Sequence, residues 1–490
     1  MNPSWRCPAA FGLALLSGCA AGPDYVAPSL DAPDAFESEA VIAMVGDGEA
    51  SALRVDWWRG FEDPLLSTLV DEALGRNFDI AAAAANVETA RAELRIADAG
   101  DAPRVDAGID SRYETRRFIS EGGTNAEGGS AAGSLGVGLA PDLFGRTRRR
   151  VEAAEAALEA ARHALAGAVL ATSAEVVRTY LVYRGTERQI ELLRESVALQ
   201  EKTRRLVASR YEAGLSPELD LRRAETSVER LRADIPPLER ALADARQQLA
   251  TLSGRYPGTL TARLGTAPGI PGYAFRIDAP VPAAALRARP DVRRAEAELK
   301  RSVAAIGIAE AEYTPLVELF ADVQIATGGI GFVSALDRII GSIGATVGQR
   351  VFDGGARSAR VDAARAAADS ALAAYRQRLL DAARSIESTL NALAASRSRQ
   401  DALMKAVTAS ARSFEQAERL YQLGLSSFLD VVDAQRVLAS AEQALAAERT
   451  TYATQIATLF EALGGGAVEA SAQLSAAPGT GRAPMKAQDP

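Results

Sequence analysis

The residues of this chain that could carry out catalysis or bind a metal ion are few and scattered. The single histidine among 490 residues, His163, lies in an alanine-rich stretch without cysteines or clustered carboxylates at ligand spacing. Catalytic triads and zinc sites both need such partners. The glycine pairs at 122–123 and 354–355 lack the Lys-Ser/Thr that completes a phosphate-binding loop. The sequence therefore predicts a protein that is not an enzyme and holds neither metal nor cofactor, so that any energy comes from a partner.

Both cysteines lie in an N-terminal segment that is typical of a targeting signal. Arg6 precedes an apolar stretch of about ten residues, which is too short to span a bilayer as a helix. Residues 16–19 (Leu-Ser-Gly-Cys) resemble the bacterial lipobox, in which cleavage leaves the cysteine to be lipid-modified. Residues 1–18 are then a signal peptide and Cys19 is the lipidation site; an ordinary secretory signal is the alternative. Ala20 stands where inner-membrane retention would need Asp, which favours the outer membrane.

The charge of the chain argues against nucleic acid as a partner. The formal net charge is −8, and binding of the phosphate backbone requires clustered lysine and arginine. The arginine runs at 148–150 and 222–223 are short and flanked by glutamate, as on solvated helix faces. We therefore expect no nucleic-acid binding.

One sequence pattern occurs twice. The segment 211–220 (Tyr-Glu-Ala-Gly-Leu-Ser-Pro-Glu-Leu-Asp) recurs as 421–430 (Tyr-Gln-Leu-Gly-Leu-Ser-Ser-Phe-Leu-Asp), at an offset of 210 residues (424 − 214). Segment 151–154 matches 361–364 at the same offset. Such repetition predicts that each half is one architectural unit that need not be complete alone. We expect one body made of two intertwined halves.

Two long segments without proline predict two very long helices. No proline occurs between Pro141 and Pro217 or between Pro315 and Pro478. Segments 147–213 and 356–423 are rich in Ala, Leu, Glu, Arg and Gln, with apolar residues three and four apart. At 1.5 Å per residue each helix would be about 100 Å long. Rods of this length must pack side by side as a coiled-coil-like tube.

The repeated motif predicts the turn at the end of each rod. Gly214 and Gly424 suit the left-handed residue that follows a helix, and Ser216 and Ser426 suit the N-cap of the next helix. Pro217 fits the first position of the returning helix. We expect tight helical hairpins whose returning helices span about 217–254 and 427–464.

The returning helices are shorter than the rods. We expect the helices 64–100 and 290–313 to stack on them end to end, so that each repeat reaches the full length of its rod. The adjacent prolines Pro236 and Pro237 should bend the first returning helix.

Between each short helix and each rod the apolar residues alternate with a period of two. The alternating apolar positions predict two strands in each half: Val105, Ala107, Ile109; Leu135, Val137, Leu139; Val317, Leu319, Ala321, Val323, Ile325; Ile343, Ala345, Val347. Segments of about ten residues with one apolar face are characteristic of membrane β-strands. Ordinary half-buried strands would show the same periodicity.

Four strands cannot close a barrel in lipid, because an open edge leaves backbone groups unsatisfied. The chain must therefore oligomerise. Two copies would give eight strands and a filled interior, whereas three would give twelve strands and room for a lumen. The glycine-rich stretch 121–129 then forms the first hairpin loop, and 328–339 forms its counterpart.

The whole chain resembles the TolC-like outer-membrane efflux proteins, in the lipoprotein branch that serves resistance-nodulation-division pumps. Seven segments carry the resemblance in order: Cys19 to Pro28, Trp57 to Leu66, 77–79 (Asn-Phe-Asp), 142–146 (Asp-Leu-Phe-Gly-Arg), 235–239 (Ile-Pro-Pro-Leu-Glu), 289–292 (Arg-Pro-Asp-Val) and 351–355 (Val-Phe-Asp-Gly-Gly). The resemblance implies an α+β membrane protein: a trimer with a twelve-stranded β-barrel, four strands per chain, continuous with a long periplasmic α-helical barrel.

The resemblance also implies a function and partners. The chain would be the exit duct of a tripartite efflux system, passively conducting substrates from an inner-membrane pump and a periplasmic adaptor; the exit duct of a type I secretion system is the alternative. It would be lipid-anchored in the outer membrane, in contact with outer-membrane lipid. A purely structural coiled-coil protein would need the rods alone, so the strand pairs and the lipobox count against it.

The expected organisation follows from the repeat and the resemblance together. Residues 1–18 form the signal peptide, 19–63 the lipidated N-terminal segment and part of an equatorial region, 64–254 the first repeat, 255–289 an equatorial linker, 290–464 the second repeat and 465–490 a flexible C-terminal tail.

The resemblance places the functional residues at the hairpin tips. The periplasmic gate would comprise Tyr421, Asp430, Asp433 and Asp220, and the adaptor contact would comprise Gly214, Leu215, Ser216, Gly424, Leu425 and Ser426. Asp430 and Asp433 are three residues apart and share a helix face; solvated surface is the ordinary interpretation of such a pair. Some family members carry at the position of Ser426 an arginine that holds the tip closed, and this chain lacks it.

Overall fold

The computed structural model describes residues 21–29, 56–116, 126–265, 269–273, 282–328 and 338–465. The signal peptide, Cys19 and the tail from residue 466 lie outside these residues. The described chain divides into two compact units. The first, here the sheet unit, takes its residues from 1–28, 87–161 and 295–375, and the second, the hairpin unit, from 29–86, 162–294 and 376–490.

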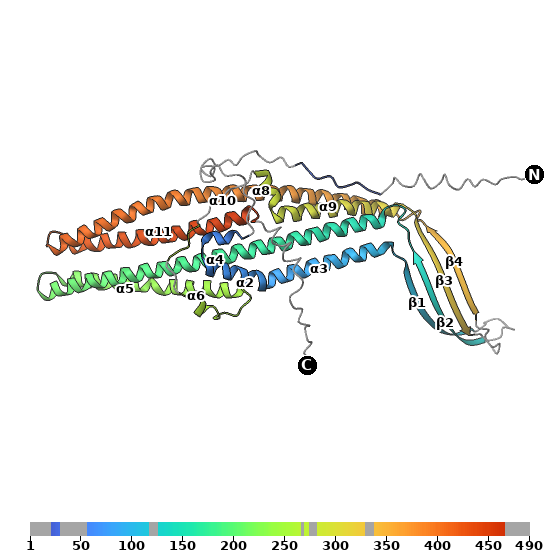
Figure 1. Ribbon diagram of the computed structural model, residues 1–490, viewed down its shortest axis with the longest axis horizontal. Coiled ribbons are helices and arrows are strands. Elements are labelled where there is room, and N and C mark those ends of the chain that lie inside the picture. The colour runs from blue at the N-terminus through green and yellow to red at the C-terminus, as the bar shows by residue number, and fades with distance from the viewer. Residues whose placement is uncertain are drawn as a thin grey trace, which may run out of the picture. The chain divides into compact units, whose positions relative to one another are not determined.

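The sheet unit holds one antiparallel four-stranded sheet with the order β1-β2-β3-β4 (Figure 1). Its strands are β1 (Arg104–Arg116), β2 (Ala126–Leu139), β3 (Leu316–Gly328) and β4 (Arg338–Gly348). The four predicted strands are confirmed, but each is longer than the run of alternating apolar residues from which it was predicted. The prediction that 121–129 is entirely loop is wrong, because residues 126–129 pair with β1. Residues 328 and 338–339 of the second predicted loop are likewise strand.

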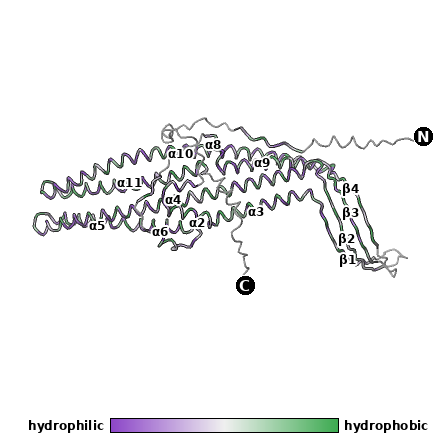
Figure 2. Tube along the Cα trace, viewed as in Figure 1, coloured by the Kyte–Doolittle hydropathy of each residue, from purple (hydrophilic) through white to green (hydrophobic). Residues whose placement is uncertain are grey.

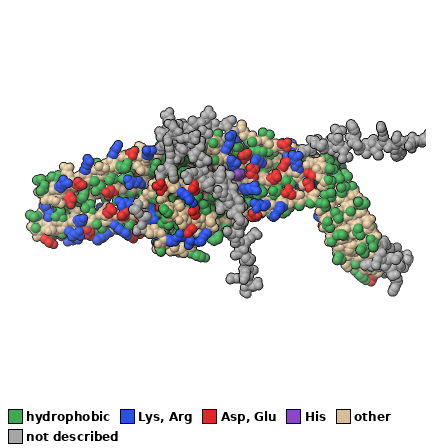
Figure 3. Space-filling view, viewed as in Figure 1, with side chains coloured by type: hydrophobic (Ala, Val, Ile, Leu, Met, Phe, Trp, Pro, Cys, Tyr) green, Lys and Arg blue, Asp and Glu red, His purple; other side chains and the backbone are tan. Residues whose placement is uncertain are grey.

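The register joins the apolar positions of the four strands into rows. Val105 pairs with Val137, which pairs with Ala321, which pairs with Ile343. Directly opposed residues share a face of the sheet. Since side chains alternate between faces along a strand, the neighbouring row, which contains Asp106, lies on the other face. Figure 2 shows hydrophobic residues along the strands, and Figure 3 shows hydrophobic side chains gathered over them. The sheet therefore has one apolar face and one face that is mostly polar or glycine.

The helices that continue into the hairpin unit are long. Helix α4 (Arg146–Glu212) turns back into α5 (Glu218–Ala233) and α6 (Ile235–Leu252), and α10 (Ala356–Gln422) turns back into α11 (Phe428–Ala462) (Figure 1). The two rods agree with the predicted ranges to within one residue at each end. The first returning helix is interrupted at Asp234, just before the two prolines that were predicted to bend it.

One described helix, α4, contains an 18-residue window apolar enough to cross a membrane by composition. Some 67% of that window is buried inside the protein. Its apolar residues, such as Val176, Val177 and Leu181, are fully buried by neighbouring helices. We therefore interpret this stretch as a packing surface between helices.

Shorter elements complete the two repeats. They are η2 (Trp57–Phe61), α2 (Pro64–Arg76), α3 (Phe78–Asp98), η3 (Ala99–Asp101), α7 (Thr261–Leu264), α8 (Pro282–Ala288), α9 (Pro290–Glu310) and η4 (Ala311–Tyr313). The first predicted short helix is divided, because Asn77 adopts an extended conformation between α2 and α3. Trp57 is fully buried and stacks on Phe460 with ring centroids 4.9 Å apart.

The expected end-to-end stacking is present inside the hairpin unit. Gly254, just after α6, approaches the carbonyl of Arg76 at the end of α2, and Gly464, just after α11, approaches the carbonyl of Ala288 at the end of α8. Both glycines have positive φ, which a glycine adopts without steric cost. Each returning helix therefore ends beside a junction between two helical segments, α6 at the junction of α2 and α3, and α11 at the junction of α8 and α9.

Candidate functional site

The two hairpin tips have the same turn geometry. Gly214 and Gly424 have φ of +71° and +76°, as predicted for the residue that follows a helix. The amide of Leu215 donates to the carbonyl of Arg210 at 2.8 Å, and the amide of Leu425 donates to the carbonyl of Leu420 at 2.8 Å. These bonds satisfy carbonyls that the helix ends leave without partners.

The predicted N-caps are wrong by one residue. Pro217, not Ser216, is the N-cap of α5, and Ser427, not Ser426, is the N-cap of α11. Ser427 forms a reciprocal capping box with Asp430, because Ser427 accepts from the Asp430 amide and the Asp430 carboxylate accepts from the Ser427 amide at 2.9 Å. Pro217 has no side-chain oxygen, so the first returning helix begins without a side-chain cap.

The predicted gate aspartates have separate partners within the chain. The Ser216 hydroxyl donates to Asp220 at 3.2 Å, Asp430 accepts from Ser427, and Asp433 accepts from Arg436 at 2.6 Å. The side chains of Asp433 and Arg436 are 59% and 76% exposed. Pairs with this exposure contribute about 0–1 kcal/mol to stability, so both groups can exchange partners at little cost.

One hydrophobic cluster joins the two tips. It contains Val207 of α4, Ala224 of α5, Phe414 and Tyr421 of α10, and Phe428 and Val431 of α11. The Tyr421 and Phe428 rings lie 6.0 Å apart between centroids. The hairpins therefore share a core at the end where they turn.

Arg210 of the first hairpin holds Tyr421 of the second. Its guanidinium lies 4.8 Å from the centroid of the Tyr421 ring, and its Nη1 donates to the Tyr421 carbonyl at 3.2 Å. Tyr421 is 5% exposed, whereas Tyr211, its counterpart in the first repeat, is 41% exposed. The predicted gate residue Tyr421 thus lies in the tip core. The sequence did not single out Arg210, although its counterpart Leu420 breaks the repeat at that position.

Exposed leucines surround both turns. The set comprises Leu215, Leu219, Leu423, Leu425 and Leu429. All but Leu423 follow the repeat, since Leu215 corresponds to Leu425 and Leu219 to Leu429. Clustered exposed apolar side chains at the end of a helical hairpin are typical of a surface that contacts another protein.

The segment that follows Cys19 is bound to the sheet unit. Arg149 is 3% exposed and donates to the carbonyls of Ala21 and Gly22 at 2.9 and 3.0 Å and to the Asp24 carboxylate at 2.8 Å. Gly22 packs against Gly307 so closely that a Cβ at Gly22 would lie 2.4 Å from the Gly307 Cα. The first described residues are therefore held in one place on α4 and α9.

Tyr25 fixes the same segment to α9. Its hydroxyl donates to Glu296 at 3.2 Å, and Lys300 lies 5.7 Å from the centroid of its ring. Burial, followed by the charge of Glu296, raises the pKa of the Tyr25 hydroxyl. This tyrosine therefore stays protonated and continues to donate its hydrogen bond throughout the ordinary pH range.

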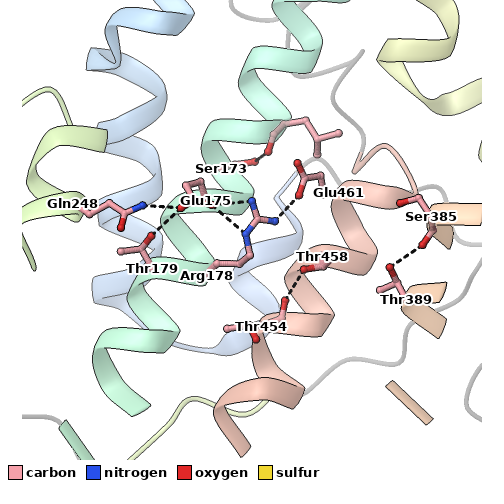
Figure 4. A network of polar contacts seen from close by, with 11 residues as sticks. Ser173, Glu175, Arg178, Thr179, Gln248, Ser385, Thr389, Thr454, Thr458 and Glu461 are labelled. Carbon is pink, nitrogen blue, oxygen red and sulfur yellow. Dashed lines mark hydrogen bonds and ion pairs between the residues drawn. The ribbon is translucent and has the colours of Figure 1, made fainter. Parts of the chain in front are cut away.

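A polar network connects three helices of the hairpin unit (Figure 4). Glu175 of α4 accepts from Gln248 of α6 at 2.8 Å and from Arg178 at 2.9 Å, and Arg178 also donates to Glu461 of α11. The three ionised groups are only partly exposed. The network links both returning helices to the first rod.

Comparison with known proteins defines the class. The family model described as outer membrane efflux protein matches residues 69–255 and 281–465, more than half of the chain. The chain therefore belongs to the outer membrane efflux protein family.

Several known proteins are similar to this chain over nearly its full length. The chain is 29% identical over 460 residues to nodulation protein T of Rhizobium leguminosarum bv. trifolii, covering 92% of this chain and 95% of that protein. It is 28% identical to the toluene efflux pump outer membrane protein TtgC of Pseudomonas putida, over 94% of this chain and 95% of TtgC. It is 30% identical to outer membrane protein OprJ of Pseudomonas aeruginosa, over 93% and 96% of the two chains.

Solved structures agree with this assignment. The outer-membrane channel OprN has a TM-score of 0.84 and 30% identity, with 92% of this chain and 100% of that chain covered. The MtrE outer membrane channel of Neisseria gonorrhoeae has a TM-score of 0.77 and 27% identity, with 91% and 98% covered. The predicted fold class, an α+β outer-membrane channel chain that contributes four strands, is confirmed. The protein is an outer-membrane efflux channel.

Proposed function

We propose that three copies of the chain form the exit duct of a tripartite efflux system, joined to a periplasmic adaptor and a resistance-nodulation-division pump of the inner membrane. The observation that carries the proposal is the four-stranded sheet with one apolar face and two edge strands, β1 and β4. Edge strands in lipid need partners. Pairing of β1 with β4 of the next copy would supply them and close the barrel.

Three copies are favoured over two by the space a duct requires. Strands of 11 to 14 residues are long enough for the 9–11 residues that a tilted membrane strand needs. Eight such strands enclose only side chains, whereas twelve leave a lumen. Chemical crosslinking of the purified channel and single-channel conductance in planar bilayers test this. A trimer that conducts is expected, and a non-conducting dimer would contradict the proposal.

The lipid anchor is proposed at Cys19. The bound segment after it supports this, because the Ala21 amide donates to the Phe144 carbonyl at 3.3 Å and Phe144 lies between β2 and α4. The residues that follow Cys19 would then lie near the boundary of the membrane. A Cys19→Ala variant should incorporate no radiolabelled fatty acid and should still reach the outer membrane through its barrel, since the acyl chains add only about 0.8 kcal/mol per buried methylene. Label retained in the variant would refute the anchor.

The adaptor is proposed to dock at the hairpin tips, on the exposed leucines around Gly214, Ser216, Gly424 and Ser426. The names of the relatives support a pump partner, because TtgC is named as the outer membrane protein of a toluene efflux pump. Site-directed photocrosslinking from Leu215 and Leu425 should capture the adaptor that is encoded with the channel. Crosslinks of equal yield from Ile96, an exposed apolar residue of α3, would show that contact is not specific to the tips.

The gate is proposed to consist of Asp430 and Asp433, with Asp220 and Tyr421 beside them. In a threefold ring at ~8 Å, like carboxylates would repel by roughly 2 kcal/mol per pair at an effective dielectric near 20. Such a ring would attract cations, so the closed channel should be cation-selective and blocked by multivalent cations from the periplasmic side. The exposed Arg436, 2.6 Å from Asp433, would reduce the negative potential of the ring.

The test of the gate must separate charge from helix capping. Asp430→Asn keeps an oxygen acceptor for Ser427, whereas Asp430→Ala would also remove the cap, so the informative variant is Asp430→Asn with Asp433→Asn. It should lose the block and much of the cation selectivity. Arg436→Ala should have the opposite effect and strengthen both. Unchanged selectivity in the double variant would place the gate elsewhere.

A further inference from the structure

The two strand pairs of the sheet are equivalent parts of the internal repeat. Strand β1 begins at Arg104 and β3 begins at Leu316, an offset of 212 residues (316 − 104). Arg104 pairs with Gly138 of β2, and Leu316 pairs with Gly348 of β4, an offset of 210 residues (348 − 138). The first offset also relates η3 to η4, and the second also relates the two tip glycines. The pairs β1–β2 and β3–β4 therefore share one register.

The join between these two strand pairs lies inside the chain. Strand β2 pairs antiparallel with β3, with Val137 opposite Ala321 and Gly133 opposite Ile325. The edge strands β4 and β1 are the equivalents of β2 and β3 in the other repeat (Figure 1). Strand β4 thus presents to a second copy the kind of edge that β2 presents to β3. Strand β1 presents the counterpart of β3.

We propose that the next copy of the chain pairs through its β1 with β4 in the register of the β2–β3 join. Shifting Val137 by +210 residues and Ala321 by −212 residues places Val347 opposite Ile109 of the next copy. The inference rests on the proposed trimer and adds the surface through which the copies recognise one another, here called the seam. The same shifts place Gly348 opposite Gly108, Thr346 opposite Asp110 and Ile343 opposite Tyr113.

The seam register matches the faces of the two edge strands. Val347 and Ile109 both lie on the apolar face and are 67% and 91% exposed in the single chain, and Ile343 and Tyr113 are 88% and 69% exposed. Directly opposed β-branched and aromatic side chains stabilise antiparallel strands. A shift by one residue would place every apolar side chain opposite a residue of the polar face. The proposed register avoids this along the whole seam.

The loop that follows β4 presents two apolar side chains at the same edge. Gln349 donates to the carbonyl of Tyr313 at 3.2 Å and so holds the start of the loop. Val351 and Phe352 follow and are 92% and 87% exposed. The equivalent loop after β2 lies against the start of β3 in the same chain. In the seam, Val351 and Phe352 lie in the same way against the start of β1 in the next copy.

One ion pair forms only between copies. Arg350 is exposed and makes no hydrogen bond or ion pair with the residues that the structure describes. The seam register places it opposite Asp106 of the next copy, which is 66% exposed and binds Arg104 at 2.7 Å. At the join inside the chain the corresponding residues are Ala140 and Glu318 (350 − 210 and 106 + 212), which cannot form such a pair. The complementary charges at the seam favour this register.

Paired cysteines test the register. Val347→Cys with Ile109→Cys should give disulfide-linked copies under mild oxidation, because directly opposed residues have Cα atoms about 4.5–5.5 Å apart, within the range of a disulfide. Val347→Cys with Val105→Cys is the control and should give none, since four residues along a strand span about 13 Å. Cys19, the one other cysteine after the signal peptide, carries the proposed lipid. Non-reducing SDS gels report the products.

A second pair guards against a variant that does not assemble. Thr346→Cys with Asp110→Cys lies one row away on the polar face and should also link the copies. Trimers that form by light scattering in detergent but give no disulfide from either pair would overturn the register and leave the proposed trimer intact. Equal yield from the control pair would also overturn it. A wild-type protein that forms no trimer would overturn the proposed function, and the seam with it.

The ion pair is tested separately. Arg350→Ala should lower the temperature at which the trimer dissociates in SDS, because every seam loses its contact with Asp106. Arg365→Ala, which removes an ion pair with Glu310 inside one copy, is the matched control and should leave this temperature unchanged. A decrease for Arg365→Ala as large as that for Arg350→Ala would overturn the ion pair between copies.

Discussion

Asn77 and Arg289 lie at equivalent points of the two repeats, and each donates a side-chain hydrogen bond to the last carbonyl of a returning helix. Asn77 Nδ2 donates to the Leu252 carbonyl at the end of α6 at 3.0 Å, and Arg289 Nη1 donates to the Ala462 carbonyl at the end of α11 at 2.6 Å. The last carbonyls of a helix have no partners inside it and carry partial negative charge. Two different side chains thus make the same joint between stacked helices.

Removal of either side chain should weaken its joint. Asn77→Ala and Arg289→Ala each leave a carbonyl without this donor, and we expect a loss of about 1–3 kcal/mol in the free energy of unfolding. Arg289→Ala should cost more, because Arg289 also bonds both oxygens of Asp291. Thermal unfolding followed by circular dichroism in detergent measures this. Arg91→Ala, which removes an exposed pair with Glu88, is the control, and an equal loss there would contradict the assignment.

Gly254, which lies at the joint between α6 and α2, should tolerate substitution less than Gly214, which lies at the tip of the first hairpin. A Cβ at Gly254 would lie 2.5 Å from the Arg76 carbonyl oxygen, whereas a Cβ at Gly214 would meet no described atom within 4 Å. Both have positive φ, so alanine brings the same backbone strain of about 1–2 kcal/mol at each site. Gly254→Ala should therefore lower the melting temperature clearly more than Gly214→Ala. Similar shifts would mean that the joint can open without cost.

We expect the turn at Gly424 to affect docking of the adaptor and not assembly of the β-barrel. Gly424→Val places a β-branched side chain at φ +76°, which costs about 1 kcal/mol or more in each copy. We expect impaired crosslinking to the adaptor and reduced export, with the outer-membrane oligomer intact on gels. Full export by this variant would show that the turn conformation is not needed.

Arg210 should hold the second tip closed against the first. Arg210→Ala removes the bond to the Tyr421 carbonyl and the contact with its ring, and a cation–π contact of this kind is worth about 0.5–2 kcal/mol. The variant should show higher single-channel conductance and faster proteolysis near residue 424. The conductance of Arg210→Lys, which keeps the positive charge and an N–H donor, should lie between those of wild type and Arg210→Ala. Wild-type conductance in Arg210→Ala would exclude this role.

The joint at Arg289 should respond to acid. Burial alone would raise the pKa of Asp291, but the hydrogen bonds and charge of Arg289 outweigh it and lower the pKa. A carboxylate with a lowered folded-state pKa stabilises the fold above its unfolded pKa of about 3.9 and loses this contribution as the pH falls through the folded value. Asp291→Asn should therefore destabilise the protein at pH 7, and the difference from wild type should shrink only as the pH falls below about 4, through the lowered pKa of the folded state. A difference that is independent of pH would contradict the ion pair.

Local patterns in the sequence determined the helices, the turns and the two faces of the sheet. The rods were predicted to within one residue, because a long run without proline and with good helix formers has one stable local structure. Gly214 and Gly424 were predicted because positive φ favours glycine. The capping serine was assigned one residue early, since Ser426 and Ser427 suit an N-cap equally and only the observed backbone decides between them.

Long-range packing determined contacts that the repeated sequence pattern could not predict. Tyr211 and Tyr421 have the same local sequence signal, yet one is exposed and the other is buried, because Tyr421 packs in the hydrophobic cluster of the two tips and also lies under the side chain of Arg210. Arg149 binds residues that precede it by more than a hundred positions, and Gln200 and Gln435 line one cavity from different hairpins. Such contacts depend on which surfaces meet after the helices have formed, and periodicity within one segment carries no information about that choice.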